Sequence, residues 1–169
     1  MRIQPTIKAA VSFGAGIFIT FSQSHSPEVG LYTLAAYGLI VGLSSVALAF
    51  GRKTEGALQE LPMATLATLV GIFAFLAAQS GQGLLEAFLA LTATWGLISG
   101  AFGLYQARRF GFKAQTGRDH LLSSIFALLL GALFLGVPLD AVSAVGFFGA
   151  YLALDGVHWG IAAASPKGK

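Results

Sequence analysis

Long apolar segments separated by short polar stretches run through the whole chain. Each segment is longer than a membrane β-strand and lacks the alternation of apolar and polar residues that such strands show. A helix needs about 17 to 25 residues to span the hydrocarbon core of a bilayer. The pattern therefore predicts six transmembrane helices, at residues 7–22, 29–50, 62–79, 85–106, 121–137 and 140–163.

The composition agrees with a lipid-embedded chain. Charged residues make up 10% of the sequence and hydrophobic residues 56%, whereas soluble domains carry about 25% charged residues. The chain has no cysteine, which excludes disulfides, thiol chemistry and cysteine-ligated metals. We therefore expect an all-α integral membrane protein.

The basic residues indicate how the helices are oriented in the membrane. Every Lys and Arg either lies at the start of the first predicted helix or follows the second, fourth or sixth, whereas Glu28, Glu86 and Asp140 lie at or beside the opposite helix ends. Because cytoplasmic loops carry an excess of Lys and Arg, this predicts a bacterial inner-membrane protein with both termini in the cytoplasm. The same distribution explains the net charge of +3 without a nucleic-acid partner.

A weak internal repeat links the even-numbered segments. Tyr37, Trp95 and Tyr151 each stand five residues before a glycine, and an acidic residue precedes each of them. Gly16, Gly71 and Gly131 recur in a similar way in the odd-numbered segments. We therefore expect one transmembrane domain over residues 1–169, built as three tandem helical hairpins with a pseudo-threefold repeat, at about 7–53, 61–109 and 118–166.

Several of these motifs resemble those of a known family. They are the run from Val145 to Gly156, the stretch from Trp95 to Arg109, the residues 117–120 and Pro138. Together they resemble the HdeD-like family of short-repeat bacterial membrane proteins. The resemblance implies a polytopic inner-membrane protein associated with acid resistance. It implies no defined activity and no catalytic residues.

Glycines recur at intervals of four residues in the even-numbered segments. The pairs Gly38/Gly42 and Gly96/Gly100 lie on one face of their helices, as does a stripe formed by Gly149, Ala153, Gly156 and Gly160. Small residues at this spacing let helix backbones approach closely in lipid. We therefore interpret them as packing seams. They do not form a phosphate-binding loop, because no strand precedes them and no GK[ST] sequence follows.

Asp155 is the residue within the spans that most invites a functional explanation. An ionised Asp at the centre of a spanning helix costs about 2.5 to 3.5 kcal/mol on insertion scales. The structural interpretation is a helix tie, hydrogen-bonded to Ser99 or to a tyrosine hydroxyl, with His158 and Trp159 as interfacial anchors. The functional one is an intramembrane site for a cation, a proton or a lipid tail, in which Tyr37, Trp95 and Tyr151 converge one layer from Asp155, with Ser99 and His158 nearby.

The cluster Arg108, Arg109, Lys113 and Arg118 also has two interpretations. It either fixes the topology or attracts anionic lipid headgroups, at about 1 kcal/mol per base near the surface. No spacing typical of a metal site or a hydrolase occurs in the chain, so we expect no metal, no cofactor and no catalytic residue.

Two functional classes remain open. The first is a non-enzymatic accessory or scaffold protein in envelope or acid-stress physiology, with membrane lipid, a second copy or a partner membrane protein as its contacts. The second is a small transporter or channel for protons, cations or a lipidic ligand, built around Asp155. A lipid-modifying enzyme would require a cluster of polar residues that the sequence does not reveal.

Overall fold

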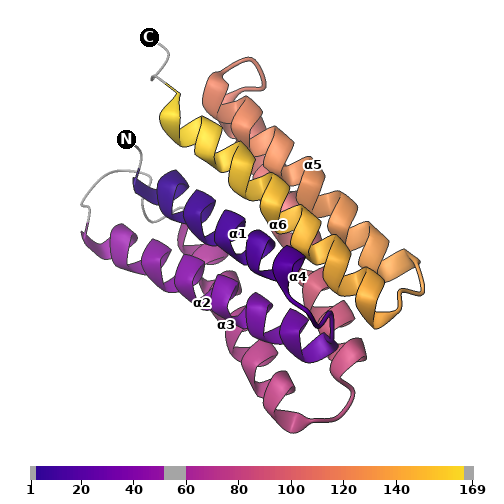
Figure 1. Cartoon of the computed structure of the whole chain (residues 1–169). Helices are drawn as coiled ribbons and strands as arrows, with labels where there is room; N and C mark the ends of the chain where they lie inside the picture. Colours follow the sequence, from indigo (N-terminus) through magenta and orange to yellow (C-terminus); the bar gives the residue numbers. More distant parts are fainter. Residues whose placement is uncertain (1–2, 52–59, 166–169) are drawn as a thin grey trace.

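The computed structural model describes residues 3–51 and 60–165, and these residues form six α-helices without a strand (Figure 1). The helices are α1 (Ile3–Phe21), α2 (Pro27–Gly51), α3 (Leu61–Ser80), α4 (Leu84–Phe110), α5 (Gln115–Gly136) and α6 (Ala141–Ala164). Five of them, α2 to α6, are long and apolar enough to cross a membrane. The chain is therefore a multi-pass membrane protein, and the predicted all-α class is confirmed.

The helices extend beyond the apolar segments that predict them. α1 begins at Ile3 rather than at residue 7, and α5 begins at Gln115 rather than at residue 121. Hydropathy marks only the lipid-embedded part of a helix, whereas backbone hydrogen bonding continues through polar turns. Gln4, Thr6 and Lys8 lie in the first two turns of α1, and they lower its hydropathy relative to the other helices.

Two helix starts carry the expected capping residues. The hydroxyl of Ser26 accepts a hydrogen bond from the Val29 N–H at 3.5 Å, directly before Pro27 opens α2. Asp140 caps α6, since its carboxylate accepts hydrogen bonds from the Ser143 N–H at 3.0 Å and from the Ser143 hydroxyl at 2.8 Å. These hydrogen bonds hold the pKa of Asp140 below its usual value.

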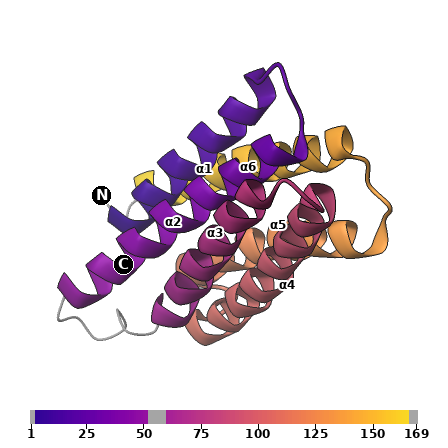
Figure 2. The ribbon, with the colours of Figure 1, turned by 90° about the horizontal axis from the view of Figure 1, so that it is seen from below.

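The most extensive helix contacts join α4 to α5, α1 to α6 and α2 to α3. Figures 1 and 2 show α1 lying along α6, although they are the first and last helices of the chain. Helices α1 and α2 touch less, and so do α3 and α4, and α5 and α6. The packing therefore differs from the expected hairpins, because the close partners lie across the predicted repeat boundaries.

Glycine positions explain these partnerships. A methyl group added at Gly71 would lie 2.8 Å from the backbone N of Leu39, and one added at Gly131 would lie 2.7 Å from the backbone N of Leu97. At Gly16 it would lie 2.5 Å from the backbone N of Ala153. Only glycine allows backbones to approach this closely. The interpretation of the glycines as packing seams is confirmed for Gly38, Gly42, Gly96, Gly100, Gly149 and Gly156, where an added methyl group would also clash with the neighbouring helix.

Large apolar side chains cover the outside of the bundle. Phe73 and Leu76 on α3, Leu129 on α5, and Leu154 and Ile161 on α6 are all more than half exposed. In water such a surface would be unfavourable, but lipid tails solvate it well. The outer surface therefore agrees with a chain surrounded by lipid.

The centre of the bundle is a layer of aromatic side chains from α2, α4, α5 and α6. The rings of Tyr37 and Trp95 meet edge to face at 5.5 Å, and Phe88 meets Phe148 at 5.6 Å. Tyr151 stacks beside Phe148 at 6.5 Å. Each such aromatic pair adds about 0.5 to 1.5 kcal/mol beyond simple burial. These five rings all belong to the buried core of the bundle.

Candidate functional site

Asp155 lies completely buried on α6 and is the centre of a polar cluster formed by three helices. Its Oδ1 accepts hydrogen bonds from the Ser123 hydroxyl on α5 at 2.8 Å and from the Trp159 indole N–H at 3.0 Å. Its Oδ2 accepts one from the Ser12 hydroxyl on α1 at 3.4 Å. A buried carboxylate is tolerated when donors satisfy it in this way.

Lys8 supplies the opposite charge. Its Nζ lies 3.5 Å from Oδ2 of Asp155 and 3.5 Å from the Ser123 hydroxyl, and it stands 4.5 Å above the centre of the Trp159 ring. The Lys8 side chain is 23% exposed, whereas that of Asp155 is fully buried. The ion pair thus neutralises Asp155, and the ammonium group borders an internal space.

The hydrogen bond expected between Asp155 and Ser99 or a tyrosine hydroxyl was a wrong prediction. The donors to Asp155 come from α1, α5 and α6, and the hydroxyl of Ser99 makes no hydrogen bond to any described residue. The reason is that α6 packs mainly against α1 and touches α4 much less. Ser12 and Lys8 on α1 therefore lie beside the carboxylate.

The aromatic residues of the predicted site do come together. Tyr37, Trp95 and Tyr151 are all buried in one core, and Trp95 and Tyr151 both line the same cavity. His158 lies apart from them. Its Nε2 is hydrogen-bonded to the backbone carbonyl of Asp119 at 2.8 Å, and its ring meets Phe126 edge to face at 6.2 Å. His158 therefore ties α6 to α5 rather than facing the cavity.

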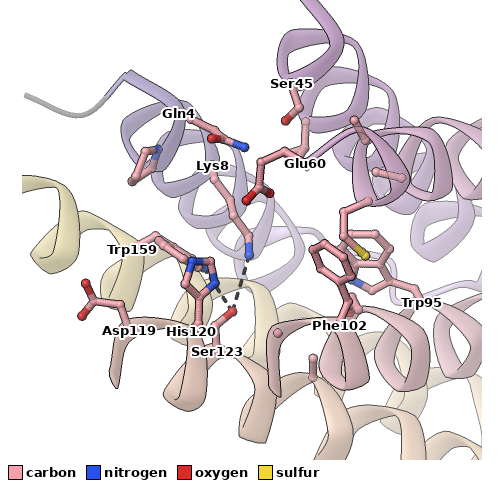
Figure 3. Close-up of a pocket in the computed structure, with 18 of the residues that line it drawn as sticks. Gln4, Lys8, Ser45, Glu60, Trp95, Phe102, Asp119, His120, Ser123 and Trp159 are labelled. Atoms are coloured by element: carbon pink, nitrogen blue, oxygen red, sulfur yellow. Dashed lines mark hydrogen bonds between the residues drawn. The ribbon is translucent and has the colours of Figure 1, made fainter. Parts of the chain in front are cut away.

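A cavity of about 690 Å³ opens between the helices on the side of the aromatic layer where α1 begins. Its polar wall includes Gln4, Lys8, Glu60, Ser99, His120 and Ser123, which come from α1, α4, α5 and the residue before α3 (Figure 3). Trp95 and Tyr151 line its deep end, while Phe102, Met63 and Ala67 contribute apolar surface. The volume falls in the range of about 300 to 1,000 Å³ that small-molecule sites occupy.

Glu60 is one of two acids that line this cavity, and Asp119 is the other. Its Oε1 accepts a hydrogen bond from the Gln106 side-chain amide at 3.1 Å, and the carboxyl group faces Lys8 across the cavity (Figure 3). Burial raises the pKa of Glu60, while the positive charge of Lys8 and hydrogen bonds from Gln106 and Gln4 partly oppose the rise. Lys8 thus pairs with Asp155 and faces Glu60 across the cavity.

The basic cluster lies at the turn between α4 and α5. Arg108 and Arg109 end α4, while Lys113 and Arg118 lie in the turn and at the start of α5. All four are exposed. Arg2, Arg52, Lys53, Lys167 and Lys169, which share in the predicted charge asymmetry, lie outside the described residues. Within the described ranges, no group of three or more acidic or imidazole side chains is placed to hold a metal ion.

Sequence reasoning missed four residues of the site: Lys8, Ser12, Glu60 and Ser123. Lys8 could be explained fully by the positive-inside rule, and Glu60 lies in a predicted loop. Ser12 and Ser123 are ordinary polar residues in apolar segments. A usable signal did exist, since Ser12 stands one helical turn from Lys8 and would share its face.

Neither protein-family models, nor curated proteins, nor solved structures gave a match to the chain. The resemblance to the HdeD-like family therefore stays a prediction. Any functional conclusion has to come from the geometry of the cavity.

Proposed function

We propose that this protein binds an amphiphilic organic cation in the cavity between its helices, as the substrate site of a small transporter. The observation that carries this proposal is the cavity itself, in which Glu60 faces Lys8 over an aromatic floor. The cavity favours a transporter over a scaffold, because a scaffold does not require a polar cavity between its helices. The protein acts without enzymatic chemistry in this proposal.

The charge balance supports a cationic ligand. Lys8 is already paired with Asp155 at 3.5 Å, so Glu60 adds a negative charge that Lys8 does not fully compensate. In a medium of low dielectric constant, an unbalanced carboxylate attracts a positive group strongly. Faces of aromatic rings such as Trp159 and Trp95 also favour cations, and Lys8 already uses the Trp159 ring in this way.

Binding of octyltrimethylammonium tests the proposal. The chain has two tryptophans, Trp95 and Trp159, and both line the cavity, so their fluorescence reports its occupancy. We expect saturable quenching by octyltrimethylammonium with the protein in nanodiscs, and none by octanesulfonate. Glu60→Gln should weaken binding at least about tenfold, as expected for loss of a charge-assisted contact.

Glu86→Gln is the matched control, because Glu86 is an exposed acid in the first turn of α4. It should leave the affinity unchanged. Equal quenching by the cation and the sulfonate, or equal affinity in Glu60→Gln and the parent, would contradict the proposal.

The pH dependence follows from the state of Glu60. Binding requires its carboxylate form, and the pKa of Glu60 is raised by burial. We therefore expect the affinity for octyltrimethylammonium to fall on acidification, beginning at a higher pH than an exposed Glu would give, because protons and the cation compete for one group. Glu60→Gln should make the profile flat. A profile that is the same in both proteins would show that another group is titrating.

We also propose a six-span topology in the bacterial inner membrane, with α1 as the sixth span and both termini cytoplasmic. The described bases support it, since they lie in the second turn of α1, at the end of α4, in the α4–α5 turn and at the start of α5. Those segments lie at one end of the bundle in Figure 1. The acids Glu28, Glu86 and Asp140 lie at the starts of α2, α4 and α6.

The pseudo-threefold repeat is part of the same proposal. It is supported by the equivalent glycine contacts of Gly71, Gly131 and Gly16 in the three closest helix pairs. In this arrangement α2, α4 and α6 surround the axis, and Tyr37, Trp95 and Tyr151 are their equivalent aromatic residues in the central layer. The exposed outer surfaces remain for lipid, a second copy or a partner membrane protein.

A further inference from the structure

Two polar groups at the deep end of the cavity have no hydrogen-bond partner. The indole N–H of Trp95 lies near the Tyr151 hydroxyl but makes no hydrogen bond with it or with any other described residue. The Ser99 hydroxyl also has none within the described ranges. Trp95 is 4% exposed, so the group is well shielded. Buried polar groups are nearly always satisfied by protein, water or ligand.

The two residues that carry these groups line the same cavity. Trp95 and Ser99 are one turn apart on α4 and so share a helix face, and both line the cavity. An indole N–H can only donate, and a serine hydroxyl can donate as well. The group that would complement both is therefore a hydrogen-bond acceptor.

The spacing along α4 relates this pair to the charged end of the cavity. Glu60 is held by Gln106, which stands seven residues after Ser99, or about 10 Å along the helix at 1.5 Å per residue. Between the two levels the cavity wall is formed by Phe102, Met63 and Ala67, which are apolar. The cavity thus has a charged end, an apolar middle and a hydrogen-bond-donating end.

We infer that the natural ligand is an elongated molecule with a cationic head at Glu60 and a hydroxyl, carbonyl or ester oxygen at the opposite end, held by Trp95 and Ser99. This inference rests on the proposed function, and it adds the substrate class. Head and oxygen are separated by an apolar chain that spans about 10 Å of helix α4. A purely hydrophobic cation leaves both donors unsatisfied and binds less tightly.

The test compares octyltrimethylammonium with its ω-hydroxy analogue by calorimetry, with the protein in nanodiscs. We expect the hydroxylated probe to bind about tenfold more tightly, the gain of one well-formed buried hydrogen bond. Ser99→Ala should reduce this advantage, measured within each variant as the ratio of the affinities for the two probes. Trp95→Phe should reduce the same ratio. Thr94→Ala, at an exposed position on the same helix, is the control and should keep the full advantage.

The outcomes separate the two proposals. If both probes bind equally well, or if the advantage survives in Ser99→Ala combined with Trp95→Phe, the inference about the acceptor is wrong while cation binding stands. If neither probe binds, the proposed function fails and the inference fails with it.

Discussion

Replacing Asp155 by asparagine will lower the unfolding temperature of the detergent-solubilised protein by about 5 to 10 °C. Removing one partner of a buried ion pair leaves the other charge uncompensated, which costs about 3 to 5 kcal/mol. Lys8 is 23% exposed, so its ammonium group retains some solvation, and we expect a loss of about 2 to 3 kcal/mol. That loss corresponds to a few degrees per kcal/mol for a chain of this size.

A double-mutant cycle isolates the ion pair. Lys8→Met alone should also destabilise the protein, because the buried carboxyl group of Asp155 then loses its cationic partner. The combined variant Lys8→Met with Asp155→Asn should lose less than the sum of the two single losses, since neither charge remains. Additive losses in the cycle, or an unchanged unfolding temperature in Asp155→Asn, would show that the two side chains do not stabilise each other.

Replacing Gly16 by leucine should disrupt the fold, whereas replacing Gly14 in the same helix should not. Even a methyl group at position 16 would lie 2.5 Å from the backbone N of Ala153, while at position 14 nothing lies within 4 Å. Overpacking a tight seam costs about 1 to 3 kcal/mol and sometimes more, and leucine is much larger than a methyl group. Gly14 is exposed, so leucine there points into lipid.

Thermal unfolding and gel filtration in detergent measure this contrast. Gly16→Leu should lower the unfolding temperature strongly or yield aggregated protein, and Gly14→Leu should match the parent. Because the two sites are half a turn apart on one helix, general effects of removing a glycine are the same for both. Equal behaviour of the two variants would mean that α1 does not pack against α6 through this seam.

Much of the fold could be predicted from the sequence because a helix that spans lipid must be long and apolar. Apolar segments marked all six helices, and glycine spacing at Gly38, Gly96 and Gly156 marked the seams, because hydropathy and small side chains are local properties of the chain. The contact between Tyr37 and Trp95 was expected on the basis of the predicted repeat, which itself stays a prediction. The resemblance to a family, the orientation and the activity remain predictions.

The partners of Asp155 could not be predicted in the same way. Ser12 and Asp155 are 143 residues apart in the chain, and their contact depends on which helices become neighbours. Sequential hairpins are the default expectation for neighbouring transmembrane segments. Here the closest pairs are shifted by one helix, so α1 supplies Lys8 and Ser12 to the site. The Ser99 hydroxyl on α4 makes no hydrogen bond with Asp155 or with any other described residue. Long-range pairing of this kind leaves no local signal.

The contact between the first and last helices has a consequence for biosynthesis. During translation, α1 is synthesised long before α6, so the ammonium group of Lys8 lacks its partner Asp155 until the last helix is complete. In the nascent chain, the surface of α1 that α6 later covers is still exposed. Closure of the bundle is therefore a late event, and a ribosome-stalled chain that lacks α6 should be the form that chaperones and membrane proteases recognise.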